Sequence, residues 1–424
     1  MAIEAAAGFP AAVAAVATVD ATEVDMKYLA TLGETNCWPF PADGLKAKDD
    51  VALKSKTLPV PAWFSGSGNE DVLLHFVALD GADTISQNTS AATVSNHTDE
   101  VRTVWKTNDS AVCTPEVIWS QFLSKFTRPL GYEGGNLAFA TDFTTRKDGM
   151  GYHTTDFTFV GFQRKYLTYV PSTYDASKSA PLVVVLHGYT ATMYALAEES
   201  QWCDVAEANG LIVVFGQAYP NVIAGYPNIP CPAWITPNLF KKSEGNTDDF
   251  AYLSEVISRT EKEYAIDKSR VYMTGHSNGS AMTIAFASMQ PETVAAVGPI
   301  GFTTPGITDI KDITVPAWFL KGEFDGNGMT LEKGNGNIQC MEYWTKWNKL
   351  NIDDAAEAEE GVGNRFLTRT WSDKQGDPVV KFSAVRRSAH SYFPEESWKL
   401  WNEFFSHYSK VDGVSYYDGK ALSL

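Results

Sequence analysis

The stretch Gly275-His276-Ser277-Asn278-Gly279 decides the fold, because it places a serine between two glycines. A β-forming run at 270–274 leads into it, and a helix-forming run at 280–287 leads out. A strand, a GxSxG turn and a helix in this order are typical of a sharp turn that presents a nucleophilic serine above a sheet. The stretch therefore predicts Ser277 as a nucleophile; the alternative is a structural serine in a glycine-rich turn.

A second signature lies upstream, where the apolar run 181–186 ends in His187-Gly188-Tyr189. A continuous apolar run of this length is typical of a strand buried on both faces of a parallel sheet. The loop after such a strand is where enzymes with this turn place donors for a developing oxyanion. We expect these donors to be the backbone N–H of Asn278 and that of Tyr189 or its neighbour; the alternative is an ordinary strand-to-helix loop.

A serine nucleophile needs a base, and the seven histidines allow a search by elimination. His187 and His276 lie inside the two loops just described, where they are poorly placed to act on Ser277. His390 is the predicted base, because it lies between a strand-like run and a C-terminal helix; a helix-capping role is the alternative. The other histidines lie in a segment without a nucleophile, before the first hairpin or on an amphipathic helix, and are His75, His97, His153 and His407.

The acid that orients the base is expected between nucleophile and base, after a strand. The run 315–320 is such a strand, and the loop 322–326 follows it. Asp325 is the predicted acid and Glu323 is the alternative. A purely turn-forming Asp325 is the structural interpretation of the same residue.

Alternating β and α runs predict an α/β fold with a mostly parallel, doubly wound sheet. The segments 155–159 and 164–170 alternate in polarity and predict an antiparallel hairpin that opens this sheet. Ligands of such folds bind at the carboxyl ends of the strands. The predicted triad and the oxyanion loop all follow such ends.

Five stretches in the order of the chain carry a family resemblance: 164–171, 181–188, 210–214, 247–250 and 271–279. Through them the sequence from Gly151 to about Tyr408 resembles the poly(3-hydroxybutyrate) depolymerase and feruloyl esterase group of α/β-hydrolases. The resemblance implies a serine carboxylic-ester hydrolase that acts through an acyl-enzyme, secreted or periplasmic, without cofactor or metal. It implies hydroxycinnamoyl esters, or polyesters such as polyhydroxyalkanoate, as substrates.

The alternatives are a serine peptidase, a small-ester carboxylesterase and a catalytically inactive binding module. Two departures from the group's pattern lie near the expected cleft, at Cys231-Pro232-Ala233-Trp234 and at Ser388-Ala389-His390, and they leave the substrate open. The residues expected to line the substrate cleft are His187, Gly188, His276, Trp234 and Tyr392.

The N-terminal segment repeats the second half of this hydrolase. Val60-Pro61-Ala62-Trp63-Phe64 is identical to residues 315–319, and Pro10–Val16 parallels Pro291–Val297. The aromatic spacing at 119–126 parallels that at 401–408. We therefore expect a half-hydrolase module at 1–130, repeating about 282–410, and a catalytic domain at 131–424.

The half-module has no serine turn and no oxyanion loop, so we expect it to be non-catalytic. Ala111-Val112-Cys113 stands where the complete copy has Ala389-His390-Ser391. Glu70 or Asp71 is either a remnant of the acid or part of a solvated loop. The module is either the remnant of a tandem duplication or a structural domain that docks on the hydrolase or on a second subunit, forming a homo-oligomer.

Composition limits the partners. There are 51 acidic and 34 basic residues, a formal charge of −17, which argues against nucleic acid and anionic membranes. No run is long enough to span a bilayer, and no signal peptide is recognisable in this sequence. Five cysteines leave one unpaired; a Cys203–Cys231 disulfide is open, and no cysteine or histidine pattern suggests a metal.

Overall fold

The computed structural model divides the chain into two compact units, Met1–Thr145 and Arg146–Glu360 with Asn364–Leu424, Gly361–Gly363 grouping with the first. The predicted boundary near residue 130 precedes this division. The residues that the structure describes are 15–19, 60–66, 70–80, 82, 84–88, 92–96, 102–127, 138–139, 151–225, 229–237, 239–240, 247–307, 310–326, 331, 334–361, 365–386 and 388–424.

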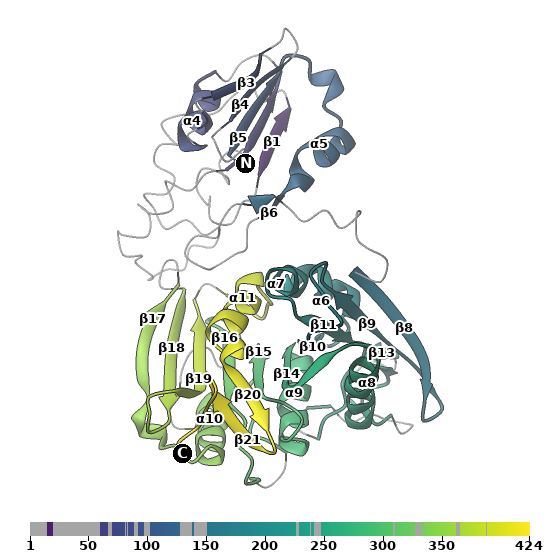
Figure 1. Ribbon diagram of the computed structural model, residues 1–424, viewed down its shortest axis with the longest axis vertical. Coiled ribbons are helices and arrows are strands. Elements are labelled where there is room, and N and C mark those ends of the chain that lie inside the picture. Colours follow the sequence, from purple (N-terminus) through teal and green to yellow (C-terminus); the bar gives the residue numbers. More distant parts are fainter. Residues whose placement is uncertain are drawn as a thin grey trace. The chain divides into compact units, whose positions relative to one another are not determined.

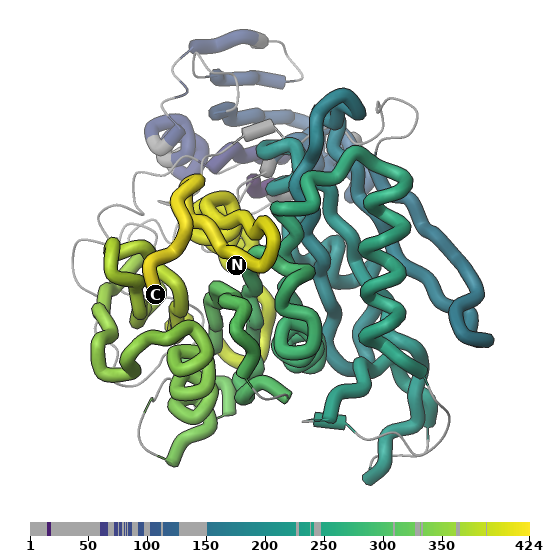
Figure 2. Tube along the Cα trace, turned by 60° about the horizontal axis from the view of Figure 1, so that its bottom comes forward, coloured from purple at the N-terminus to yellow at the C-terminus, as the bar shows by residue number. Residues whose placement is uncertain are grey.

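The second unit is built on a sheet of ten described strands in the order β17-β18-β19-β16-β15-β14-β10-β11-β9-β8 (Figures 1 and 2). The six strands from β19 to β11 are mutually parallel, and the antiparallel strands lie at the two edges. This arrangement confirms the predicted α/β-hydrolase sheet. The bounds are β8 Gly151–Phe159, β9 Phe162–Val170, β10 Ala180–Leu186, β11 Ile212–Gly216, β14 Ile266–His276, β15 Ala296–Ile300, β16 Ala317–Gly322, β17 Ala356–Glu360, β18 Phe366–Ser372 and β19 Pro378–Val385.

Helices cover both faces of this sheet, because its central strands are apolar on both sides. In β10, Leu182 and Val184 pack in one core with α8, α9 and α10, whereas Val183 and Val185 pack in the other with α6, α7 and α11. This alternation follows from the two-residue period of a strand. The helices are α6 Met193–Glu199, α7 Trp202–Asn209, α8 Asp249–Glu263, α9 Asn278–Met289, α10 Gly336–Trp347 and α11 Pro394–Glu403.

One local prediction about this unit, the hairpin, is confirmed. β8 and β9 form the expected hairpin, with Phe159 paired to Phe162 and positive φ angles of 49° at Val160 and 80° at Gly161 in the turn. Asp248 begins α8, because its side chain accepts a hydrogen bond from Ala251 N at 2.9 Å. The acidic pair 248–249 is therefore a helix start.

The disulfide considered from the sequence is not formed. Neither Cys203 nor Cys231 takes part in a disulfide, and the same holds for Cys113 and Cys340. The Cys203 sulfur instead lies 3.1 Å from the hydroxyl of Tyr152, which satisfies a buried thiol without a partner cysteine. No helix in the described ranges combines the length and apolarity needed to cross a bilayer.

The first unit contains a smaller sheet in the order β1-β2-β5-β4-β3. β1, β2 and β5 are parallel and β4 and β3 antiparallel, the same directions as in β15, β16, β19, β18 and β17. The registers also agree, since Val16 pairs with Ala62 as Val297 pairs with Ala317. The bounds are β1 Val16–Val19, β2 Ala62–Ser65, β3 Thr84–Asn88, β4 Ala92–Asn96 and β5 Thr103–Thr107.

Side-chain packing follows the same correspondence. The rings of Trp63 and Phe122 lie 5.8 Å apart at 65°, and those of Trp318 and Phe404 lie 5.8 Å apart at 69°. Phe122 ends α5 (Pro115–Gln121) with φ −135° and ψ −71°, and Phe404 ends α11 with −143° and −73°. These agreements support the predicted repeat. The part of it at 10–14 lies outside the described residues.

One expectation for the first unit is wrong. Of the two alternatives for Glu70 and Asp71, a solvated loop is contradicted, whereas a remnant of the acid stays a prediction. Both residues form the first turn of α4 (Glu70–Asp80). Acidic residues suit this position because the amino end of a helix is electropositive.

A buried ion pair ties the edge of the hydrolase sheet to α8. Arg164 Nη2 lies 2.9 Å from Asp249 Oδ1, and the two side chains are 2% and 0% exposed. The guanidinium also lies 3.6 Å from the centre of the Tyr252 ring. Asp249 Oδ2 accepts a hydrogen bond from Ile235 N at 3.0 Å, so both carboxylate oxygens are used.

Replacing Arg164→Met should destabilise the protein by about 3 kcal/mol or more, because it leaves a buried carboxylate without its counter-ion. Urea denaturation followed by circular dichroism measures the change. Lys178→Met is the matched control, since Lys178 pairs with Asp175 at the surface, where the side chains are 82% and 48% exposed. Equal denaturation midpoints for Arg164→Met and Lys178→Met would contradict this account.

Candidate active site

Ser277 occupies the turn between β14 and α9 with a backbone conformation that a non-glycine residue rarely adopts. Its φ is 56° and its ψ is −112°. Such a conformation costs about 1–3 kcal/mol and persists only where the surroundings hold it. Here Ser277 N donates to Ile300 O at 2.8 Å, and Ser277 O accepts from Ala281 N at 3.0 Å. The strained turn lifts the hydroxyl clear of the sheet.

The two glycines of the motif are required by close backbone contacts. A Cβ at Gly279 would lie 2.1 Å from Leu186 O, on the neighbouring strand β10. A Cβ at Gly275 would lie 2.6 Å from the backbone of Gly279. Neither position has room for a side chain, so GxSxG here reflects the packing of α9 against the end of β10.

The structure brings Ser277, Asp325 and His390 together from three different strand ends. His390 Nε2 lies 2.7 Å from Ser277 Oγ. His390 Nδ1 lies 2.9 Å from Asp325 Oδ2. The imidazole is 47% exposed and the carboxylate 10% exposed, so the base faces solvent while the acid lies beneath it. The arrangement has the order nucleophile, base and acid that acyl transfer needs.

The acid and base loops are joined through their backbones. Phe324 N donates to Ser388 O at 2.9 Å, and Glu323 N donates to Val385 O at 2.9 Å. The short contact between His390 Nδ1 and Asp325 Oδ2 does not have the geometry of a hydrogen bond. Asp325 Oδ2 accepts no hydrogen bond from any other residue that the structure describes. Catalytic hydrogen bonds often tighten only with substrate bound. Asp325, chosen over Glu323 from the sequence, is the residue at His390.

The predicted oxyanion donors lie next to the serine. Asn278 begins α9, so its N–H points out of the positive end of a helix. A Cβ at Gly188 would lie 3.4 Å from Ser277 Cβ, which places the 187–189 loop against the nucleophile. Thr190 N donates a hydrogen bond to Pro232 O at 2.9 Å, so Thr190 is excluded as the second donor to the oxyanion. Tyr189 N remains the predicted second donor.

Three residues expected in the substrate cleft are buried, and that prediction is wrong for them. His187 and Trp234 are 0% exposed and Tyr392 is 5% exposed. Trp234 Nε1 donates to His187 O at 2.9 Å, and the hydroxyl oxygen of Tyr392 accepts from Trp202 Nε1 at 2.8 Å. Their polar atoms are satisfied inside the protein, as is usual for buried polar groups.

His187 is held as a neutral imidazole. Burial lowers its pKa to about 4, a shift that its bond to Gly188 O only partly opposes. Its Nε2 accepts a hydrogen bond from Ala218 N at 3.1 Å and lies 3.0 Å from Gln217 Nε2, which assigns the proton to Nδ1. Gln217 Oε1 in turn accepts from Met193 N at 3.0 Å.

Two supporting contacts were missed from the sequence. Gln217 contacts the His187 ring in the 187–189 loop, and the signal for it is a polar residue directly after the buried strand β11. The side chain of Asn278 holds Trp234, accepting from its N–H at 2.7 Å and donating to its carbonyl at 2.9 Å.

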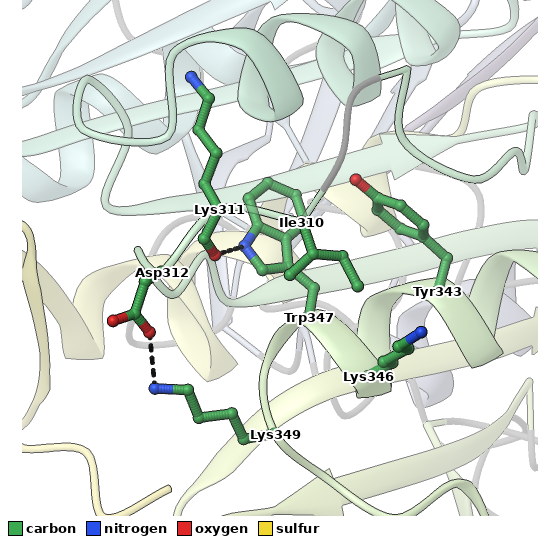
Figure 3. Close-up of a pocket in the computed structure, with 7 residues that line it drawn as sticks. All are labelled: Ile310, Lys311, Asp312, Tyr343, Lys346, Trp347 and Lys349. Atoms are coloured by element: carbon green, nitrogen blue, oxygen red, sulfur yellow. Dashed lines mark hydrogen bonds and ion pairs between the residues drawn. The ribbon is translucent and has the colours of Figure 1, made fainter.

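A cavity of about 560 Å³ lies elsewhere, at the end of α10 (Figure 3). In it Lys349 pairs with Asp312 at 2.8 Å, and Lys311 O accepts from Trp347 Nε1 at 2.9 Å. Lys311 and Asp312 precede β16, whereas Asp325 follows its end, so this cavity lies at the opposite edge of the sheet. It is not part of the candidate active site.

Comparison with known proteins points to one group of enzymes. Residues 149–311 match the acetyl xylan esterase (AXE1) family. The poly(3-hydroxyalkanoate) depolymerase C of Paucimonas lemoignei is 28% identical over 253 residues, which cover 52% of this chain and 57% of that protein. Acetylxylan esterase A of Aspergillus oryzae is 29% identical over 133 residues, 31% of this chain and 39% of that protein. The chain thus spans about half the length of these relatives, and the resemblance stated from the sequence is confirmed.

The solved structures that match part of this chain include two esterases of low sequence identity. The acetyl xylan esterase from Aspergillus awamori is 16% identical with a TM-score of 0.45, covering 60% of this chain and 99% of that one. The CE1 ferulic acid esterase from Anaeromyces mucronatus is 15% identical with a TM-score of 0.37, covering 61% and 92%.

Gly279→Ala should prevent correct folding of the serine turn, because its Cβ would overlap the Leu186 carbonyl. We expect loss of soluble protein or a sharply lower melting temperature. Gly188→Ala is the control in the facing loop, where a Cβ would make ordinary contacts of 3.4 Å and the fold should survive. Thermal denaturation of both variants decides, and a Gly279→Ala protein as stable as Gly188→Ala would refute the close-contact explanation.

Proposed function

We propose that this protein is a serine carboxylic-ester hydrolase that acts through an acyl-enzyme. The observation that carries the proposal is the position of His390, within 3 Å of both the Ser277 hydroxyl and the Asp325 carboxylate. Ser277 and the oxyanion loop also lie inside the segment that matches the acetyl xylan esterase family. Relatives that are named as esterases and depolymerases further support the proposal.

In the proposed reaction, Ser277 Oγ attacks the ester carbonyl while His390 Nε2 takes its proton. Asp325 holds the imidazole in orientation and stabilises the positive charge that it gains. The N–H groups of Asn278 and Tyr189 stabilise the oxyanion, each worth about 3 kcal/mol of the barrier. The alcohol leaves with the proton from His390. A water molecule activated by His390 then hydrolyses the acyl-enzyme and regenerates Ser277.

The proposed substrates are esters carried by polymers: acetyl or hydroxycinnamoyl groups on xylan, or the ester links of a polyhydroxyalkanoate. This range follows from the family match and from the names of the relatives. A panel of acetylated xylan, methyl ferulate, polyhydroxybutyrate, p-nitrophenyl acetate and a peptide amide ranks the candidates. Cleavage of the peptide with no ester turned over would favour a serine peptidase instead.

Ser277→Ala should lower the turnover of p-nitrophenyl acetate by about six orders of magnitude, because the remaining groups cannot form an acyl-enzyme. Ser280→Ala, three residues along α9, is the matched control and should keep most of the activity. A fluorophosphonate probe should label the wild-type protein and Ser280→Ala but not Ser277→Ala. Wild-type turnover by a folded Ser277→Ala protein would end the proposal.

We further propose that residues 1–130 are a non-catalytic half-copy of about 282–410. This half-copy stabilises the protein by docking on the hydrolase or on a second subunit. The shared strand order, registers and ring contacts support the common origin. In the half-copy, the segment that corresponds to the base loop contains no histidine, and no GxSxG motif occurs. The catalytic groups of the proposed mechanism all belong to the other unit.

Deletion of residues 1–130 should leave turnover per active site within about twofold of the full chain, since no proposed catalytic group is removed. Solubility or melting temperature should fall, because the deletion would expose the apolar surface on which the half-copy is proposed to dock. Turnover normalised by fluorophosphonate titration, together with calorimetry, gives both results. Loss of turnover in a folded deletion protein contradicts the non-catalytic role, and an equally stable monomer contradicts docking.

A further inference from the structure

His276 lies beside the reacting groups, and the proposed mechanism gives it no task. It is the last residue of β14, directly before Ser277. Its ring centre lies 4.9 Å from that of His390, and the two planes are inclined by 40°. The side chain of His276 therefore packs against the imidazole of the proposed base.

The space around His276 is closed on its other sides. A Cβ at Gly301 would lie 3.1 Å from His276 Nε2 and 3.5 Å from His390 Cε1. A Cβ at Gly188 would lie 3.4 Å from His276 Nδ1. The ring of Tyr392 meets His276 edge-on at 6.2 Å and 86°. Because Tyr392 is itself fixed by hydrogen bonds, this wall cannot easily give way.

The chemistry of His276 indicates that its shape matters more than its nitrogen atoms. Its Nε2 is buried and has no hydrogen-bond partner in the described part of the chain. Burial is the main cause that lowers its pKa to about 4; the charge of His390 acts in the same direction, and Asp325 opposes the shift. At neutral pH the ring is therefore uncharged.

His390 needs such support, because nearly half of its side chain is exposed. An exposed histidine can rotate among several side-chain conformations, and only one keeps Nε2 on the serine. We infer that His276 is a positioning residue whose neutral ring supports His390 from behind and holds Nε2 on Ser277. The inference rests on the proposed function. An uncharged neighbour also spares the positive charge on His390 from like-charge repulsion.

The test compares His276→Ala, which removes the ring, with His276→Phe, which keeps a flat ring without nitrogen atoms. Turnover of p-nitrophenyl acetate is measured per active site titrated with a fluorophosphonate. His276→Ala should lower kcat on the order of ten- to a hundredfold with KM nearly unchanged, because a displaced base slows the chemical step. His276→Phe should stay within about threefold of wild type. The rate of fluorophosphonate labelling should follow kcat.

The pH profile gives a second readout. The charged and titratable groups that face His276 are His390, Asp325 and Tyr392, and all three are present in His276→Phe. Since the neutral His276 takes up no proton above about pH 5, the acid limbs of kcat/KM for wild type and His276→Phe should coincide there. A displaced acid limb in His276→Phe would show that His276 titrates during catalysis and would overturn the inference.

Two other results would also overturn it: wild-type kcat in a folded His276→Ala protein, or a His276→Phe protein as slow as His276→Ala. His276→Asn replaces the alanine variant if that variant does not fold, and the same reduced kcat is expected. The Ser277→Ala baseline separates the two levels of the argument. Activity that survives in Ser277→Ala refutes the proposed function and, with it, this inference, whereas unchanged His276 variants refute the positioning role alone.

Discussion

The close approach of α9 to the end of β10 is the constraint on which the site depends. Gly279 leaves no room for a Cβ, so the amino end of α9 lies directly against the Leu186 carbonyl. This contact places Asn278 N and the loop at Gly188 on the same side of Ser277. The strained turn is the consequence, because a relaxed serine could not join a strand and a helix packed so tightly.

A chain of buried contacts leads from the edge of the sheet to this turn. Arg164 holds Asp249, whose second oxygen accepts from Ile235 N. The preceding residue, Trp234, is clamped on both its N–H and its carbonyl by the side chain of Asn278. The ion pair thus stabilises the residue beside the nucleophile through backbone hydrogen bonds. Buried polar networks of this kind restrict a core to one arrangement.

The sequence predicted the parts of the site that depend on local pattern and chain order. Ser277 stands in a motif, and His390 and Asp325 follow from the order of strands and loops. The burial of Trp234 and Tyr392 could not be predicted, because an aromatic residue suits a cleft and a core equally well in sequence. The absence of a Cys203–Cys231 disulfide could not be predicted either, since pairing depends on distances between segments far apart in the chain.

Because the segments 60–64 and 315–319 are identical, either strand could pair with the neighbours of the other while the chain folds during synthesis. The first copy leaves the ribosome well before the second, and repeated segments are known to exchange partners in nascent proteins. The neighbouring strands differ enough to tell the copies apart: Trp63 lies opposite Trp105, whereas Trp318 lies opposite Lys381, whose ammonium covers its ring at 3.6 Å. The two identical strands thus have different cross-strand partners, an aromatic pair in one unit and a cation on an indole in the other. This difference favours the pairing of each strand within its own sheet.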